Sequence, residues 1–154
     1  MVRIQVTGII NEMASIKDFI ADKFPDVNII LQNVPEQPIP STLVIRFQRD
    51  NREVETGFGI IANREYQLIY FGERAPDVLT KMDGLSRKFL YGRTVIPIKD
   101  SLRYIRVVGF NFGQIFKTEQ NNIEACIGVL QTEVREARDQ QTYDKIMNVY
   151  ARYE

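Results

Sequence analysis

The residue types that usually perform enzymatic or metal chemistry are scarce in this chain. Its 154 residues include no histidine and a single cysteine, Cys126. Histidine is the commonest general base and metal ligand, and Cys/His zinc sites need several such ligands. Ser–His and Cys–His nucleophile pairs cannot be built without histidine. From the residue types alone we expect no catalytic residue, no metal site and no cofactor, and therefore no enzyme.

Carboxylates are the remaining candidates for chemistry. Glu53 and Glu55 are two positions apart, so both side chains would point to the same face of a strand. Two acids in that arrangement could bind a divalent ion or share a proton. A solvated strand face accounts for the same spacing and is the interpretation we favour. A small-ligand-binding domain built on this acidic pair is the alternative from a different functional class.

Composition and charge indicate a globular domain. The chain is 44% hydrophobic and 26% charged, and its 20 basic and 20 acidic side chains cancel. Nucleic-acid-binding domains usually carry a basic excess, which is absent here. No stretch approaches the roughly 18 apolar residues that span a bilayer, and no signal-peptide pattern opens the chain. We expect no membrane partner, and the lone cysteine favours folding in a reducing cytoplasm.

Apolar spacing in the first half of the chain predicts one helix and a long hairpin. The predicted elements are a helix over residues 3–23, a strand over 27–31, a proline-rich loop over 35–40, a strand over 42–48, a polar turn over 49–52 and a returning arm over 53–71. Within that arm, Gly57 and Gly59 are expected to bend or bulge the strand.

The second half predicts another helix and another long hairpin. Pro76 opens the helix and Tyr91-Gly92 ends it, and its predicted buried stripe is Val78, Leu79, Met82, Leu85, Phe89 and Leu90. Strands are predicted over residues 95–98, 102–116 and 123–134, with a turn over 119–122. Apolar residues at helical spacing after Arg138 predict a short C-terminal helix with Tyr143, Ile146, Met147 and Tyr150 on one stripe.

This order predicts an α+β fold: an antiparallel or mixed sheet with long β-hairpins packed against two helices, plus the C-terminal helix. We divide the chain into a domain over residues 1–138 and a helical extension over 139–154. Long hairpins would project from a domain this small, and exposed strand edges invite pairing with a neighbour. The C-terminal helix could pack on its own chain or on a neighbouring subunit. Protein assembly is therefore the expected work of the chain.

Several stretches, taken in order, have a familiar arrangement. They are Lys23-Phe24-Pro25-Asp26 at the end of the first helix, Val34-Pro35-Glu36-Gln37-Pro38, Thr42-Leu43-Val44-Ile45-Arg46-Phe47, Tyr66-Gln67-Leu68-Ile69-Tyr70-Phe71, the second helix, and the hairpin from Tyr104 to Arg135. Over residues 3–138 their order and spacing resemble the tail terminator proteins of tailed bacteriophages, especially those encoded near contractile-tail genes.

The resemblance implies a non-enzymatic virion protein that forms a ring, typically a hexamer. The ring would cap the finished tail tube, end its polymerisation and join the tail to the head or neck, after assembly in the host cytoplasm. Implied partners are further copies of the chain, the tail tube protein, a neck or connector protein and a sheath protein, and DNA would pass through the lumen without specific binding. Another phage neck or head-completion adaptor is the alternative within this class.

In that family, hairpins and neighbouring loops make the ring and tube contacts. By position, the matching segments here are residues 49–58 and 117–122. The C-terminal helix departs from the family pattern and leaves open an extra contact with a sheath or connector protein. The candidate interface residues are Arg49, Arg52, Glu53, Glu55, Phe58, Lys117, Glu119, Asn121, Tyr143, Met147 and Tyr150.

Overall fold

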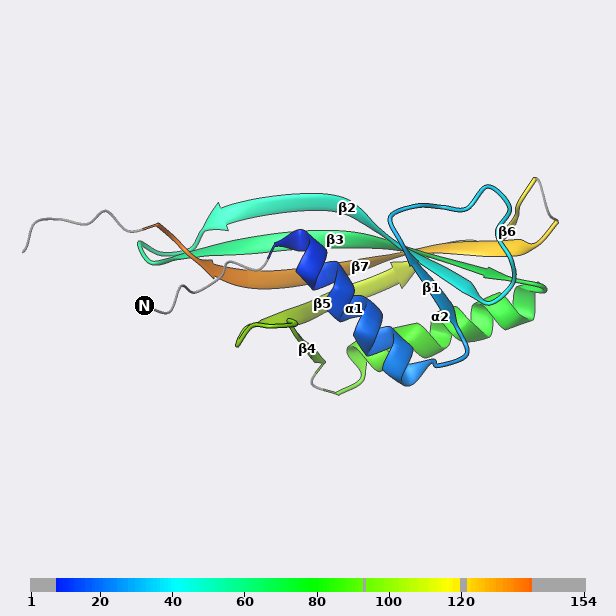
Figure 1. Ribbon diagram of the computed structural model, residues 1–154, viewed down its shortest axis with the longest axis horizontal. Helices are drawn as coiled ribbons and strands as arrows, with labels where there is room; N and C mark the ends of the chain where they lie inside the picture. The colour runs from blue at the N-terminus through cyan, green and yellow to red at the C-terminus, as the bar shows by residue number, and fades with distance from the viewer. Residues whose placement is uncertain (1–7, 93, 120–121, 140–154) are drawn as a thin grey trace, which may run out of the picture.

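The computed structural model describes residues 8–92, 94–119 and 122–139 of the chain (Figure 1). The described elements, in order, are α1 (Ile9–Lys23), β1 (Asn28–Leu31), β2 (Thr42–Val54), β3 (Gly59–Gly72), α2 (Ala75–Leu90), β4 (Val95–Pro97), β5 (Tyr104–Phe112), β6 (Phe116–Lys117) and β7 (Glu124–Ala137). Two helices and one mixed sheet confirm the predicted α+β class. The predicted C-terminal helix lies outside the described residues.

The sheet has seven strands in the order β1-β2-β3-β7-β5-β4, and β6 pairs with β7. β1 runs parallel to β2, and every other pairing is antiparallel. β2, β3 and β7 are 13, 14 and 14 residues long, whereas strands of about five or six residues are typical. These three strands form a long ribbon that continues past the helices at one end (Figure 1).

Helix α1 begins at Ile9, after Gly8 as its N-cap, and residues 3–7 of the predicted helix lie outside the described residues. The backbone of Gly8 is extended (φ −83°, ψ −178°), so this residue lies outside the helix, and it makes no side-chain cap bond. Ile16 and Ile20 are buried, while Ile10 points to solvent. Phe24 ends the helix one residue before Pro25, which disfavours a helical conformation at the residue that precedes it.

Helix α2 has the predicted limits. Pro76 lies in its first turn, where a missing N–H breaks no helical bond. Gly92 follows the end of the helix at φ +100°, a conformation that L residues rarely adopt. The buried stripe is narrower than predicted: Val78, Met82, Leu85 and Phe89 are buried, but Leu79 and Leu90 are exposed.

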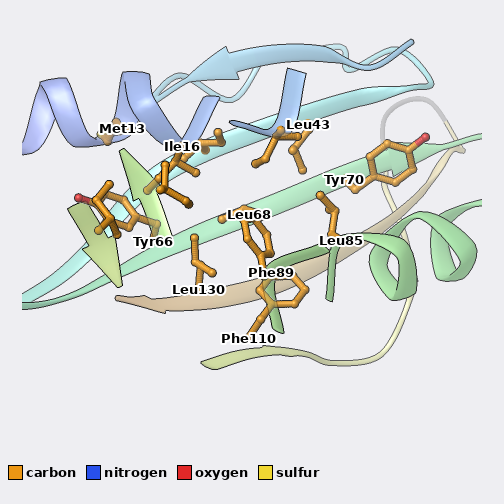
Figure 2. Close-up of a cluster of buried hydrophobic side chains, with 14 of the residues drawn as sticks. Met13, Ile16, Leu43, Tyr66, Leu68, Tyr70, Leu85, Phe89, Phe110 and Leu130 are labelled. Carbon is orange, nitrogen blue, oxygen red and sulfur yellow. The ribbon is translucent and has the colours of Figure 1, made fainter. Parts of the chain in front are cut away.

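Both helices pack on the same face of the sheet, and the main core lies between them and the strands. Its members come from both helices and from β2, β3, β4, β5 and β7. Figure 2 shows Ile16 of α1 and Phe89 of α2 directed toward Leu68 and Leu130 of the sheet. A smaller cluster of Val44, Ile69, Phe71, Ile123 and Ala125 lies on the opposite side. No described helix residue belongs to it, and we call this side the open face.

The predicted polar turn at residues 49–52 is wrong. β2 runs through these residues to Val54, pairing Arg49 with Glu65 and Asp50 with Arg64 on β3. The chain turns instead at residues 55–58, where we define the distal end of the sheet. The bend expected near Gly57 and Gly59 falls in this turn, and a separate register shift lies between Phe47 and Arg49. Cross-strand partners sustain the strand through residues whose local preference is for a turn.

The predicted strand over residues 102–116 is also corrected, because it is broken in two. β5 ends at Phe112, opposite Gly128, and β6 resumes at Phe116, opposite Ala125. Three residues, 113–115, therefore lie opposite the two residues Cys126 and Ile127, and the extra residue interrupts the ladder. Gly113 still donates its N–H to the Ile127 carbonyl (3.3 Å), so the chain stays hydrogen-bonded to β7 at the break.

Candidate functional site

The distal end presents apolar side chains to solvent. Phe58 in the turn is 74% exposed and Val54 at the end of β2 is 64% exposed. The turn itself is ordered: Thr56 Oγ1 accepts the N–H groups of Phe58 and Gly59, both at 3.1 Å. Single exposed apolar residues are common, but this pair lies at the tip of a projecting ribbon. Such a tip is suited to insertion into a partner surface.

The C-terminal part of β7 supports this tip. Arg135 Nε donates to Glu55 Oε2 at 3.0 Å, and Arg138 donates its backbone N–H to the Phe58 carbonyl at 3.0 Å. Arg138 Nη1 also donates to the Thr56 carbonyl at 3.3 Å. The two arginines thus connect β7 and the residue that follows it to the turn between β2 and β3.

A buried charge cluster anchors the ribbon to α1. Arg64 of β3 is only 1% exposed, and its guanidinium forms an ion pair with Glu12 of α1. It also contacts Glu136 of β7 at 3.1 Å and Asp50 of β2 at 3.3 Å. We call Glu12, Asp50, Arg64 and Glu136 the Arg64 cluster. One cation therefore connects α1 to each of the three long strands.

The register shift in β2 explains how Asp50 reaches this cluster. Before the shift, Leu43, Ile45 and Phe47 pair with core-facing residues of β3. Without a shift, the next odd residue, Arg49, would face the helices. The extra residue, Gln48, moves each following residue of β2 to the opposite face of the sheet. Asp50 therefore pairs with Arg64 on the helix side, and Arg49 lies on the open face. The shift thus supplies a carboxylate to a buried guanidinium.

Burial and charge shift the pKa values in this cluster. Burial raises the pKa of Glu12 above its usual range, even though the Arg64 guanidinium opposes that shift. Burial lowers the pKa of Arg64, but the hydrogen bonds and charges of Glu12 and Glu136 outweigh burial and raise it overall. Tyr66 donates its hydroxyl to Glu12 Oε2 at 3.1 Å, and burial together with the Glu12 charge raises its pKa. Arg64 is therefore a permanent cation.

The raised pKa of Glu12 predicts a pH dependence of stability. In the folded protein this carboxyl keeps its proton above the usual value of 4.5. Protonated Glu12 contributes its full share to the free energy of unfolding below pH 4.5. This contribution is lost as pH rises through the pKa that Glu12 has in the folded protein. Glutamine does not titrate. Urea titrations at a series of pH values from about 4 upward give the unfolding free energies of the wild type and of Glu12→Gln. We expect the wild-type value minus the variant value to fall as pH rises. A difference that stays constant with pH would contradict this expectation.

The open face carries a charged, shallow hollow near the middle of the ribbon. Its lining includes Arg49, Asn51, Asn63, Glu65, Val108 and Gln131. Val108 is exposed at the position where the register of β5 shifts against β7. Arg106 and Glu133 form an exposed ion pair at 3.5 Å on the same face. The mixture of charge and scattered apolar residues resembles an ordinary protein surface, so composition alone does not mark this hollow as an interface.

The structure separates the predicted interface residues into two groups. Arg49, Arg52, Glu53, Glu55 and Phe58 lie on the distal half of β2 or in its turn. Lys117 on β6 and Glu119 lie at the opposite end of the sheet (Figure 1), where they line a hollow with Pro35 and Phe71. Asn121, Tyr143, Met147 and Tyr150 lie outside the described residues.

Glu53 and Glu55, the acidic pair predicted to share a strand face, lie at the distal end of β2. β2 ends at Val54, so Glu53 lies on the strand and Glu55 in the turn. Glu55 accepts a hydrogen bond from Arg135, whereas Glu53 is exposed on the open face. Across the described ranges, no group of three or more acidic or cysteine side chains is placed to hold a metal ion. No described helix is both long and apolar enough to cross a membrane.

The Arg64 cluster was missed at the sequence level, although one signal was available. Glu12 precedes Ile16 and Ile20 at four-residue spacing, which places a carboxylate on the buried stripe of α1. A charged residue on such a stripe requires a buried partner. The partner could not be found from spacing, because Arg64 lies on a distant strand and only the packing of α1 on the sheet brings it to Glu12.

Matches to this chain are found among solved structures. No protein-family model matches the chain, and no curated protein matches it. Among solved structures, a chain of the structure described as "Virion of native gene transfer agent (GTA) particle" superposes with a TM-score of 0.47 and 12% sequence identity. The match covers 80% of this chain and 94% of that chain.

Proposed function

We propose that this protein is a structural subunit of a phage-type virion, forming a ring that caps the tail tube and joins it to the neck. The order and spacing of elements over residues 3–138 resemble tail terminators, and the described helices and sheet have the expected α+β arrangement. In the proposed ring, copies of the chain contact one another laterally, and the ribbon or its turn contacts the tube. The opposite end of the sheet, with Lys117 and Glu119, faces the neck.

The observation that carries the proposal is the projecting ribbon. β2, β3 and β7 extend past both helices and end in the exposed side chains of Val54 and Phe58. A small domain gains no stability of its own from an exposed apolar tip. The internal bonds of the turn and its arginine supports keep this tip ordered before any partner binds, which reduces the conformational entropy lost on assembly.

Electron microscopy of particles that carry a labelled copy of this chain tests the proposal. We expect the label at one end of the tail tube, as a ring at the junction with the neck. Label on the head side of the neck would favour the head-completion adaptor. Label distributed along the tube, or absent from the particles, would contradict a structural role at the tail end.

The tip predicts a sharp effect of substitution. Replacing Phe58 by aspartate should greatly reduce the number of joined particles, because a charge would be desolvated at the contact. The unfolding free energy should change by no more than about 0.5 kcal/mol, since Phe58 is exposed. Leu79→Asp on α2, also at an exposed apolar residue, is the matched control and should join normally. Equal joining by both variants would exclude the tip as a contact.

A further inference from the structure

The outer edge of β2 is unpaired over its distal half. β1 pairs only with Thr42–Ile45 of this 13-residue strand. Gln32 extends the cover slightly: its N–H donates to the Ile45 carbonyl (2.8 Å), and its side-chain oxygen accepts the Phe47 N–H (2.6 Å). Beyond this point no strand among the described residues lies against β2. Residues 48–54 therefore form a free edge.

This free edge lacks two of the usual blocks to strand pairing. Proline, lysine, bulges and inward-pointing charges usually prevent pairing with another chain. Residues 48–54 contain neither proline nor lysine. The register shift lies at their beginning, and the inward-pointing Asp50 and Arg52 form an ion pair with each other. Alternate residues of the edge present their N–H and C=O groups outward. A second strand could add here with a regular ladder.

The charges of the free edge are antisymmetric about its centre. Residues 49–53 read Arg-Asp-Asn-Arg-Glu. If a second copy of this segment is laid antiparallel with Asn51 opposite Asn51, Arg49 faces Glu53 and Asp50 faces Arg52. Every charge then faces an opposite charge. Asp50 and Arg52 already form an ion pair within the chain at 2.7 Å, so the contacts between Arg49 and Glu53 carry the pairing. The centre of antisymmetry, Asn51, is also the midpoint of the free edge, residues 48–54.

The side-chain directions agree with this register. Arg49 and Glu53 both pair with residues of the open face of β3, while Asp50 and Arg52 both point to the helix side. Antiparallel neighbours share a face, so each proposed pair is on the same side of the joined sheet. Arg49 and Glu53 are exposed, and neither has an ion-pair partner in the described part of the chain. Each therefore has a free charge that the second copy would neutralise.

We propose that two copies of this chain pair their β2 edges through a two-fold axis at Asn51, forming one continuous sheet. The interface is isologous: Arg49 of each copy contacts Glu53 of the other, and the same surface is used twice. This contact is independent of the proposed ring, whose lateral contacts would be head-to-tail. A seven-residue edge is small beside the ~1,200 Å² of a stable interface, so the dimer is reversible and weakens as salt is added.

Charge reversal and exchange test the pairing. Sedimentation velocity of the full chain over a concentration series, at low salt, should show a monomer–dimer equilibrium. Arg49→Glu should abolish the dimer, because two glutamates would face each other at each end, and Glu53→Arg should do the same with arginines. The double variant restores opposite charges and should dimerise again. Arg74→Glu, at an exposed arginine on the N-cap of α2, is the matched control and should dimerise normally.

A cysteine at the axis tests the register separately. Asn51→Cys places two thiols directly opposite each other, at Cα distances of about 4.5–5.5 Å that permit a disulfide. Mild oxidation should give a covalent dimer. Arg46→Cys is exposed on the same strand, but its two copies would be roughly 30 Å apart, so it should stay monomeric. The native Cys126 is buried.

Three outcomes would overturn the proposal: a wild-type chain that is monomeric throughout the series, a double variant that stays monomeric, or equal cross-linking at residues 46 and 51. None of these outcomes bears on the tail-end label, so failure of the dimer and failure of the ring role are distinguishable. Melting curves of each variant verify that it folds, which is expected because Arg49, Asn51 and Glu53 are all exposed.

Discussion

Replacing Arg64 by methionine should lower the free energy of unfolding by about 3–5 kcal/mol. The substitution keeps the volume of the side chain but removes the cation that three carboxylates share. Glu12 is fully buried, and Asp50 and Glu136 are largely buried. Without Arg64, Glu12 must be protonated or remain as an uncompensated buried charge. Urea titration at pH 7, with the slope of the transition compared between variants, measures the loss.

Two further variants show whether the loss of stability at Arg64 comes from the buried charges or from truncating any long side chain. Arg64→Met combined with Glu12→Met removes both buried charges, and we expect it to recover part of the stability, because an apolar pair of similar volume commonly replaces a buried ion pair without loss. Arg87→Met removes an exposed arginine paired with Asp83 and should cost under about 1 kcal/mol. A loss at Arg64 no greater than at Arg87 would refute the anchoring role.

The amino-acid sequence predicts most of the fold because the long-range pattern of apolar residues is regular. Both helices, β1 and the strands that form the core were predicted from spacing, as was the α+β class. Pro76 and Gly92 mark the limits of α2 by chemistry that acts locally. Such signals depend only on neighbouring residues, and they require no knowledge of the sheet order.

The main errors arose where partners distant in sequence determine the structure. Residues 49–52 have the composition of a turn, yet β3 pairs with all of them, and Asp50 forms ion pairs with Arg52 and Arg64. The break between β5 and β6 follows from a mismatch of one residue against β7, which no local pattern in residues 102–116 contains. Both are properties of strand register, and register depends on the whole sheet.

The candidate interface residues stay a prediction, although the structure changes where some of them lie. Glu55 and Phe58 were predicted on the returning arm, whereas they lie in the turn between β2 and β3. The arginines at residues 49 and 52 were interpreted as flanking a turn, whereas they lie on opposite faces of an edge strand. The charge antisymmetry about Asn51 is visible in the sequence alone. Its meaning depends on the free edge, which only the structure provides.

Replacing Phe89 by alanine should destabilise the chain by about 3–5 kcal/mol. Phe89 of α2 is almost fully buried, and its ring stacks on Phe19 of α1 at a centroid distance of 5.6 Å. It also packs against Phe110 of β5 at 5.4 Å. Truncation would leave a cavity where α1, α2 and the sheet meet. Leu79→Ala on the exposed side of α2 is the matched control, and urea titration should place it within about 0.5 kcal/mol of the wild type.

The contact between Phe19 and Phe89 can be separated from burial by a double-mutant cycle. Phe19→Ala, Phe89→Ala and the double variant should give a coupling free energy of about 0.5–1.5 kcal/mol, as found for aromatic pairs. α1 is fixed near its start by Arg64 and near its end by Phe89, so these two contacts determine how the helix lies across the sheet. Zero coupling, or a loss at Phe89 below about 1.5 kcal/mol, would show that the helices repack. The orientation of α1 would then depend on the Arg64 cluster.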